Sequence, residues 1–214
     1  MIEIISHRGL WRKPFERNSL ASLRSSIDEG FGLETDVRDL NGDLVISHDM
    51  PTGSDENVTL DELLRIYCSS SCNLTLALNV KSDGLSSSIK EQLQKYKIEN
   101  YFVFDMSVPD TLSYKNEGLN YFTRQSEYET EPVLYHEACG VWLDEFQGHW
   151  IGRKEIQQHI KKNKKICIVS PELHNRKYEK EWNHYKEIEQ QLNITNLMIC
   201  TDYPELAQEF FNEK

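Results

Sequence analysis

Short apolar segments alternate along this chain with segments whose apolar residues recur at helical spacing. Short apolar runs are typical of buried strands, whereas apolar residues three and four positions apart are typical of amphipathic helices. Repeated alternation predicts a parallel sheet, because the helices supply the crossovers that parallel strands need. The predicted strands are residues 2–9, 32–40, 73–80, 101–107, 120–129, 140–146, 165–172 and 196–202, and the predicted helices are residues 18–30, 59–67, 88–98, 108–118, 153–164, 178–192 and 204–214.

Eight such strands in 214 residues favour an α/β fold, the (β/α)8 TIM barrel. An open doubly wound sheet is the main alternative, but no glycine-rich nucleotide loop follows the first strand, which weakens it. After residues 32–40, the turn "NGD" predicts a short returning strand within residues 44–49. No linker or internal repeat interrupts the pattern, so residues 1–214 are expected to form one domain.

Helix boundaries have local signals of their own. Asn18 is a plausible N-cap for the first helix, and Gly30 is placed to end it. Thr59, followed three residues later by Glu62, predicts a capping box at the start of the second helix.

The charge balance limits the partners that this chain can bind. Its 35 acidic residues exceed its 24 basic residues, and the formal net charge is −11. A surface of this sign repels nucleic acid and anionic lipid, so a nucleic-acid partner is not expected. No apolar run approaches the ~20 residues of a transmembrane segment. Cys167 and Cys200 lie in predicted apolar strands, which suggests buried thiols and a reducing, cytoplasmic location.

Two carboxylates stand one residue apart in the second strand, Glu34 and Asp36. Side chains alternate along a strand, so the two share one face at a separation of ~7 Å or less. At an effective dielectric constant of about 20, their repulsion is on the order of 2 kcal/mol. A hard divalent cation such as Mg²⁺ or Ca²⁺ removes this penalty and prefers oxygen ligands. The alternatives are an exposed edge strand or an ion pair with Arg38.

Further polar residues follow the strand segments. His7 and His48 can supply one acid and one base near neutral pH, although a lone histidine is often structural. Arg8 and Lys81 are suited to holding a phosphate, Arg8 through its planar fork and Lys81 as a point charge. Surface solvation is the alternative for both cations.

Four motifs together resemble the glycerophosphodiester phosphodiesterases, a family of phosphatidylinositol-phospholipase-C-like barrels. They are "SHRG" at residues 6–9, "NS" at residues 18–19, "GLETDVRDLNGDLVISHD" at residues 32–49 and "TDYP" at residues 201–204. The resemblance implies a (β/α)8 barrel that uses a divalent metal to hydrolyse a phosphodiester of lipid metabolism to an alcohol and a phosphomonoester. In that family, a neighbouring substrate hydroxyl is thought to attack phosphorus first, and water then opens the cyclic phosphate.

Carried over by position, the resemblance gives each of these residues a role. His7 and His48 would be the general acid/base pair, Glu34 and Asp36 would bind the metal, and Arg8 and Lys81 would hold the phosphate. The family usually has a third acidic ligand at the end of the third strand, where this chain has Asn79. An amide oxygen can ligate Mg²⁺ or Ca²⁺ without contributing charge, so affinity should fall. Asp105, at the end of the next strand, is a possible substitute.

Two other departures bear on the substrate. Arg17 stands where the family usually has an acidic residue, and the loop 10–17 is basic, so it either recognises an anionic part of the substrate or is simply solvated. The segment between His48 and residue 73 lacks the family's usual insertion, which predicts an open site for a bulky or polymeric diester. Trp142, at the end of a strand, either faces a sugar or glycerol or belongs to the core.

Three activities are compatible with these residues. The leading interpretation is a metal-dependent phosphodiesterase acting on a small-molecule or glycan-linked diester. The first alternative is a lyase of the same barrel type that stops at the cyclic phosphate. The second is a non-catalytic binder of phosphorylated glycans or glycerol phosphate, although a binder has no need of two histidines.

Overall fold

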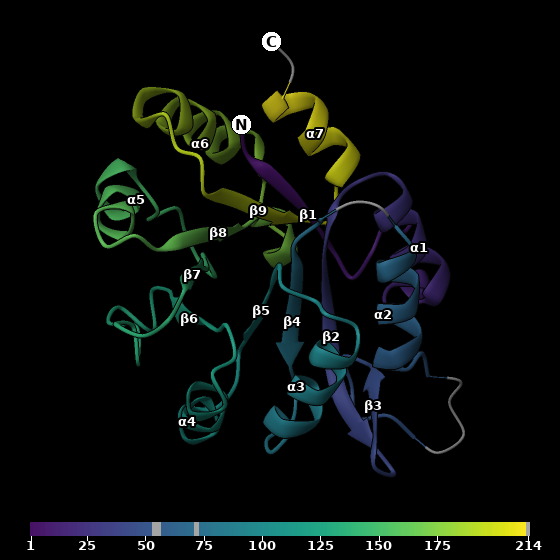
Figure 1. Cartoon of the computed structure of the whole chain (residues 1–214). Coiled ribbons are helices and arrows are strands. Elements are labelled where there is room, and N and C mark those ends of the chain that lie inside the picture. The colour runs from purple at the N-terminus through teal and green to yellow at the C-terminus, as the bar shows by residue number, and fades with distance from the viewer. Residues whose placement is uncertain (53–56, 71–72, 213–214) are drawn as a thin grey trace. The chain divides into compact units, whose positions relative to one another are not determined.

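The computed structural model describes residues 1–52, 57–70 and 73–212 (Figure 1). These residues form two compact units, residues 6–121 and residues 1–5 with 122–214. Each unit is built mainly of parallel strands with helices between most of them. That residues 1–214 form a single domain stays a prediction. Over the described residues, no helix combines the length and the apolar character needed to cross a membrane.

The unit of residues 6–121 contains the strands β2, β4 and β5, and β1 ends in it. Asp36 on β2 pairs in register with Asn79 on β4, and the hairpin strand β3 runs antiparallel to β2. Figure 1 shows α1 and α2 side by side next to β2. The elements are β1 (Glu3–His7), η1 (Pro14–Glu16), α1 (Leu20–Asp28), β2 (Gly32–Leu40), β3 (Asp43–Ile46), α2 (Leu60–Ser69), β4 (Leu76–Val80), α3 (Ser86–Lys95), β5 (Tyr101–Phe104) and α4 (Val108–Glu117).

The unit of residues 1–5 and 122–214 continues the same architecture. Its parallel strands follow one another in the order β9, β8, β7, β6, and the start of β1 lies next to β9. Within residues 126–139, between β6 and β7, there is no helix. The elements are β6 (Phe122–Gln125), β7 (Gly140–Leu143), α5 (Arg153–Ile160), β8 (Lys165–Val169), η2 (Pro171–His174), α6 (Glu179–Leu192), β9 (Leu197–Thr201) and α7 (Pro204–Asn212).

The order of strand pairing confirms the predicted fold class. Among the described residues the strands follow the sequence β5, β4, β2, β1, β9, β8, β7, β6, with β3 added to β2. Tyr121, the residue before β6, forms a parallel bridge with Val103 of β5. Strands in this order, with helices between most of them, are the topology of a (β/α)8 barrel. Cys167 and Cys200 are buried, as the sequence predicts.

Several predicted strands end earlier in the structure, for identifiable reasons. β5 stops before Asp105, whose φ of 68° is left-handed, and the residues up to 107 are not strand. β7 ends at Leu143 rather than at residue 146. Beyond it the buried Glu145 carboxylate accepts hydrogen bonds from the backbone N–H groups of Trp150 and Ile151, which folds the loop around it. These tertiary contacts have no signal in the apolar pattern.

Gly140 in β7 lies directly against the ring of Phe122. A Cβ atom there would lie within 2.7 Å of three ring carbons of Phe122, its partner on β6. We expect Gly140→Ala to lower the free energy of unfolding by about 1–3 kcal/mol, because the buried ring would have to move. Urea titration measures this difference. Gly148→Ala is the matched control, since no described atom lies within 4 Å of the position that its new methyl group would take; equal losses in both variants would contradict the expectation.

Candidate active site

The turn after β1 has an unusual backbone that places Arg8. Arg8 has a left-handed φ of 60°, and its N–H donates to the main-chain oxygen of Glu34 at 3.0 Å. Gly9 follows with a φ of 90°, and a Cβ atom there would lie 2.7 Å from the carbonyl carbon of Ser22 in α1. Only glycine fits this close approach without strain. The "HRG" motif is therefore also a packing requirement of the corner between β1 and α1.

The N-cap prediction for the first helix is wrong by one residue. Ser19 is the N-cap, and its hydroxyl accepts the N–H of Ser22. Asn18 instead has a left-handed φ of 59°, and its side chain donates to Asp36 Oδ2 at 2.9 Å and accepts from the Thr35 hydroxyl. Asn18 thus connects the first helix to the second strand. The "NS" pair was the sequence signal for this connection, but the local capping rule assigns Asn18 to the N-cap instead.

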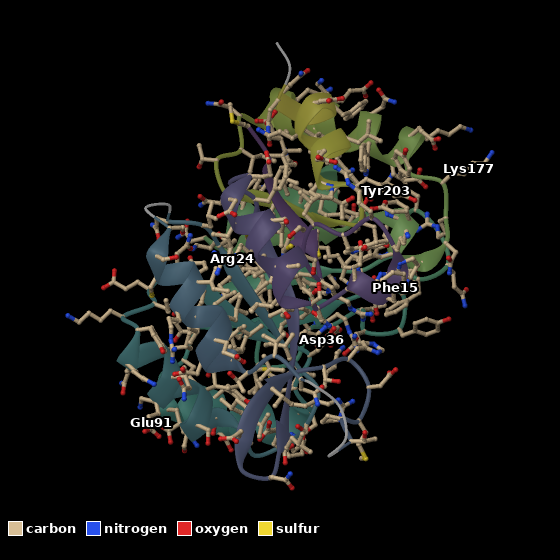
Figure 2. The ribbon with its side chains drawn as sticks, turned by 90° about the vertical axis from the view of Figure 1, so that its right-hand side faces the viewer. Phe15, Arg24, Asp36, Glu91, Lys177 and Tyr203 are labelled. Carbon is tan, nitrogen blue, oxygen red and sulfur yellow. The ribbon has the colours of Figure 1, made fainter. Side chains whose placement is uncertain are left out.

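The two strand carboxylates are buried, so the exposed-edge alternative is wrong. Glu34 is 1% exposed and Asp36 is 0% exposed (Figure 2 labels Asp36). Asp36 Oδ2 lies 2.8 Å from Arg8 Nε, and Asp36 Oδ1 lies 3.4 Å from Lys81 Nζ. The predicted alternative partner, Arg38, donates instead to the main-chain oxygen of His48. Two cations that the sequence assigned to phosphate binding therefore flank Asp36.

The buried position of Glu34 perturbs its titration. Its Oε2 accepts the Arg8 N–H at 3.2 Å and lies 3.9 Å from His7 Nε2, whose side chain is 15% exposed. Burial, with a further contribution from the negative charge of Asp36, raises the pKa of Glu34 to about 7. The repulsion predicted from the sequence is therefore present in the fold.

This raised pKa predicts an unusual pH dependence for the metal-free protein. Between the ordinary pKa of 4.5 and about 7, the folded protein binds a proton at Glu34 that the unfolded chain has released. The contribution of Glu34 to stability is therefore fully present below pH 4.5 and is lost as the pH rises through about 7, by at most about 3 kcal/mol. Urea titrations across this range, in the presence of a chelator, measure the slope. Glu34→Gln should flatten it, and an identical slope in the variant would contradict the assignment.

Side chains with oxygen donors stand on the neighbouring strands β2 and β4. Asn79 is 7% exposed and is the register partner of Asp36. Among the described residues, Asn79 Oδ1 is a buried side-chain oxygen that accepts no hydrogen bond, and Asp36 Oδ1 accepts none either, although Lys81 Nζ lies 3.4 Å away as an ion pair. Buried acceptors in this state are costly unless another group satisfies them. Glu34, Asp36 and Asn79 thus fit Mg²⁺ or Ca²⁺ by donor type, although no described cluster contains three His, Cys, Asp or Glu side chains.

The residues His7, Arg8, Glu34, Asp36, Asn79 and Lys81 are called the cluster below. His48 lies in the wall of a cavity next to this cluster. The cavity has a volume of about 540 Å³, and Arg8, Asn18 and His48 all line it. Arg8 and Asn18 also contact Asp36, so the cavity adjoins the carboxylates. His48 Nδ1 lies 2.8 Å from Asp49 Oδ1. An ionised Asp49 only accepts, so Nδ1 carries the hydrogen and Nε2 is the ring atom that can exchange a proton.

The remaining sequence candidates fall elsewhere. Asp105 comes directly after Phe104, the register partner of Asn79, and its role as a metal ligand stays a prediction. Trp142 lies in β7, in the unit of residues 122–214, and is 5% exposed. Its substrate contact also stays a prediction. Residues 53–56 and 71–72, within the segment where the usual insertion is missing, lie outside the described residues.

Other strand-end acids hold the loops of their own unit. Glu127 accepts hydrogen bonds from the N–H groups of residues 146–148. Glu172 accepts the N–H of Asp202 and the hydroxyl of Thr201. The carboxylate of Asp144 contacts His174 at 2.6 Å. These acids have structural partners.

The fold and this cluster together define a (β/α)8 barrel protein with acids, cations and a histidine at the carboxyl ends of β1, β2 and β4. No protein-family model matches the sequence, and no curated protein matches it. Solved structures do. A candidate glycerophosphodiester phosphodiesterase from Galdieria sulphuraria is 19% identical, with a TM-score of 0.78 over 100% of this chain and 98% of that one.

Two further structures have the same fold at full length. A glycerophosphodiester phosphodiesterase from Agrobacterium tumefaciens is 14% identical, with a TM-score of 0.66 over 97% of this chain and 99% of that one. A phosphodiesterase from Oleispira antarctica, solved with its product sn-glycerol-3-phosphate, is 16% identical, with a TM-score of 0.66 over 99% of this chain and 97% of that one. The resemblance seen in the sequence motifs therefore extends to the fold of the whole chain.

Proposed function

We propose that this chain is a metal-dependent phosphodiesterase that hydrolyses glycerophosphodiester-like compounds to an alcohol and a phosphomonoester. The observation that carries the proposal is the buried pair Glu34 and Asp36, flanked by Arg8 and Lys81 and adjoining His7. The shared fold of solved phosphodiesterases and the four sequence motifs support it. Fold likeness alone fixes no chemistry, so the proposal depends on this cluster.

The residues of the cluster would have separate roles in binding. Glu34, Asp36 and Asn79 would hold the cation. When bound, the cation would offset the negative charge that builds up on the phosphoryl oxygens in the transition state. Arg8 and Lys81 would hold the non-bridging phosphate oxygens as charged donors.

His7 and His48 would move the protons. One imidazole accepts a proton from the attacking hydroxyl, which belongs to the substrate or to water, while the other donates one to the departing alkoxide. If a substrate hydroxyl attacks, a cyclic phosphate forms and water then opens it. In the overall reaction one P–O bond to the alcohol breaks and one P–O bond to water oxygen forms. The two hydrogens of water end on the alcohol and on the phosphomonoester.

Product analysis tests the proposal directly. The purified protein is incubated with glycerophosphocholine, glycerophosphoglycerol and larger glycerophosphoryl chains, with Mg²⁺, with Ca²⁺ or with a chelator. Phosphorus NMR should show a phosphomonoester that forms only with metal. A stable cyclic phosphate would indicate the lyase instead. Binding without turnover of any diester would indicate the non-catalytic binder, and rejection of the larger chains would contradict an open site.

A further inference from the structure

We propose that the cavity beside the cluster binds a second anionic group of the substrate, a further phosphate on the alcohol part of the diester, and that Arg17 selects it. This inference rests on the proposed phosphodiesterase function and names the class of substrate. It concerns the cavity of about 540 Å³ that Arg8 and Arg17 line together. Cavities of this size hold ligands well beyond a single phosphate group.

Two arginines, Arg8 and Arg17, line the cavity. Arg8 lies against Asp36 and belongs to the part of the wall next to the carboxylates. Arg17 comes from the loop between β1 and α1, together with the exposed side chain of Phe15, which Figure 2 labels along with Asp36. A ligand held at Arg8 by its scissile phosphate therefore extends along the wall toward Arg17.

Arg17 is held in a defined orientation. Its guanidinium carbon lies 4.2 Å from the centre of the Trp11 ring, in a cation–π arrangement. The Trp11 indole N–H donates to the main-chain oxygen of His7 at 3.0 Å. The stacked guanidinium is thus tied through Trp11 to the backbone of a proposed catalytic residue. Stacking covers one face of the planar group and keeps its N–H donors at the edge, the geometry that binds phosphate oxygens in pairs.

The surrounding charge favours an anion rather than a cation. The loop 10–17 contains Arg12, Lys13 and Arg17 against one acid, Glu16. The Glu16 carboxylate accepts the backbone N–H groups of Arg12 and Lys13, which lowers its pKa and ties it to its own loop. This positive loop stands out in a chain whose net charge is −11.

The wall does not suit a quaternary ammonium group. Aromatic faces bind such groups, and the exposed aromatic ring in the lining of this cavity is that of Phe15. The ammonium of Lys13 already lies 5.7 Å from the centre of that ring. The acid in the wall, Asp49, is bonded to His48. Choline-type headgroups are therefore disfavoured relative to a phosphorylated one.

Two measurements test the proposal, using Arg17→Gln and the control Arg12→Gln, which changes the same charge on the same loop outside the cavity lining. The first is the ratio of kcat/KM for a glycerol phosphate dimer with a terminal phosphate to kcat/KM for glycerophosphoglycerol. Arg17→Gln should lower this ratio about tenfold or more, mainly through KM, because a charge-assisted contact is lost. Arg12→Gln should not. Glycerophosphoserine distinguishes a carboxylate from a phosphate as the recognised group.

The second measurement is the Kd of the dimer by calorimetry, which does not depend on turnover. If Arg17→Gln raises the Kd about tenfold and Arg12→Gln does not, the subsite is supported. This holds even if no diester is hydrolysed, because the absence of hydrolysis would overturn only the proposed function. An unchanged Kd together with an unchanged ratio in Arg17→Gln overturns the subsite. Equal losses on both substrates also overturn it, because they would mean that Arg17 only supports Trp11 and His7.

Discussion

Replacement of His7 by alanine is expected to lower kcat/KM for glycerophosphodiesters by about 10²–10⁴-fold, the usual contribution of a general acid or base. The imidazole lies at the end of β1, 3.9 Å from the buried Glu34 carboxylate, and is 15% exposed. Most of the loss should appear in kcat, because proton transfer is a transition-state contribution. His48→Ala should act similarly, and the double variant should lose little more than either single one.

The control for His7→Ala is His136→Ala, an exposed histidine in the other unit. It should leave kcat/KM within about twofold, since surface substitutions usually have small effects. Thermal unfolding of His7→Ala, measured in parallel, shows whether the variant folds. A folded His7→Ala protein with wild-type kcat/KM would remove His7 from the mechanism.

Asn79→Asp should tighten metal binding by about tenfold or more, because it adds a charge to the ligand set while nearly preserving side-chain shape. In the metal-free protein the new carboxylate would face its register partner Asp36 in a buried position, so the variant should be less stable than wild type. Addition of Mg²⁺ or Ca²⁺ should reverse that loss. Calorimetric titration gives the Kd, and thermal unfolding with and without metal gives the stability.

Asn41→Asp is the matched control for Asn79→Asp, since Asn41 is exposed in the turn between β2 and β3. It makes the same change of charge without approaching the carboxylates. If Asn41→Asp tightened metal binding as much as Asn79→Asp, the effect would be one of net charge. If Asn79→Asp changed neither the Kd nor the metal-free stability, Asn79 would not be a ligand.

The periodicity of the apolar residues predicts which helices and strands this fold contains, but it does not predict where they end. A two-residue period places Glu34 and Asp36 on one face of a strand, and the structure buries both. The apolar pattern cannot show where β5 stops, because the left-handed conformation of Asp105 ends it. It also cannot show that the loop after β7 folds around Glu145, which depends on residues far from that strand's own pattern.

Asn18 shows the same limit within the candidate site. A local capping rule assigns it to the start of α1, but its side chain contacts Asp36 and Thr35 on β2. The sequence predicts that Arg8 and Lys81 bind a phosphate, and the structure places both against Asp36. Contacts between elements determine the partners of these side chains, and the pattern of a single segment does not contain those contacts.

The positions of these residues along the chain have an evolutionary consequence. Every proposed acid, base, cation and metal ligand of the cluster, the alternative ligand Asp105 included, lies in the unit of residues 6–121. The strands β6–β9 belong to the other unit and supply none of these groups. Drift in that half is therefore free to reshape substrate preference or solubility while the reacting groups are inherited together. A fold organised this way can diverge in the unit that contains residues 122–214 without dispersing the proposed cluster.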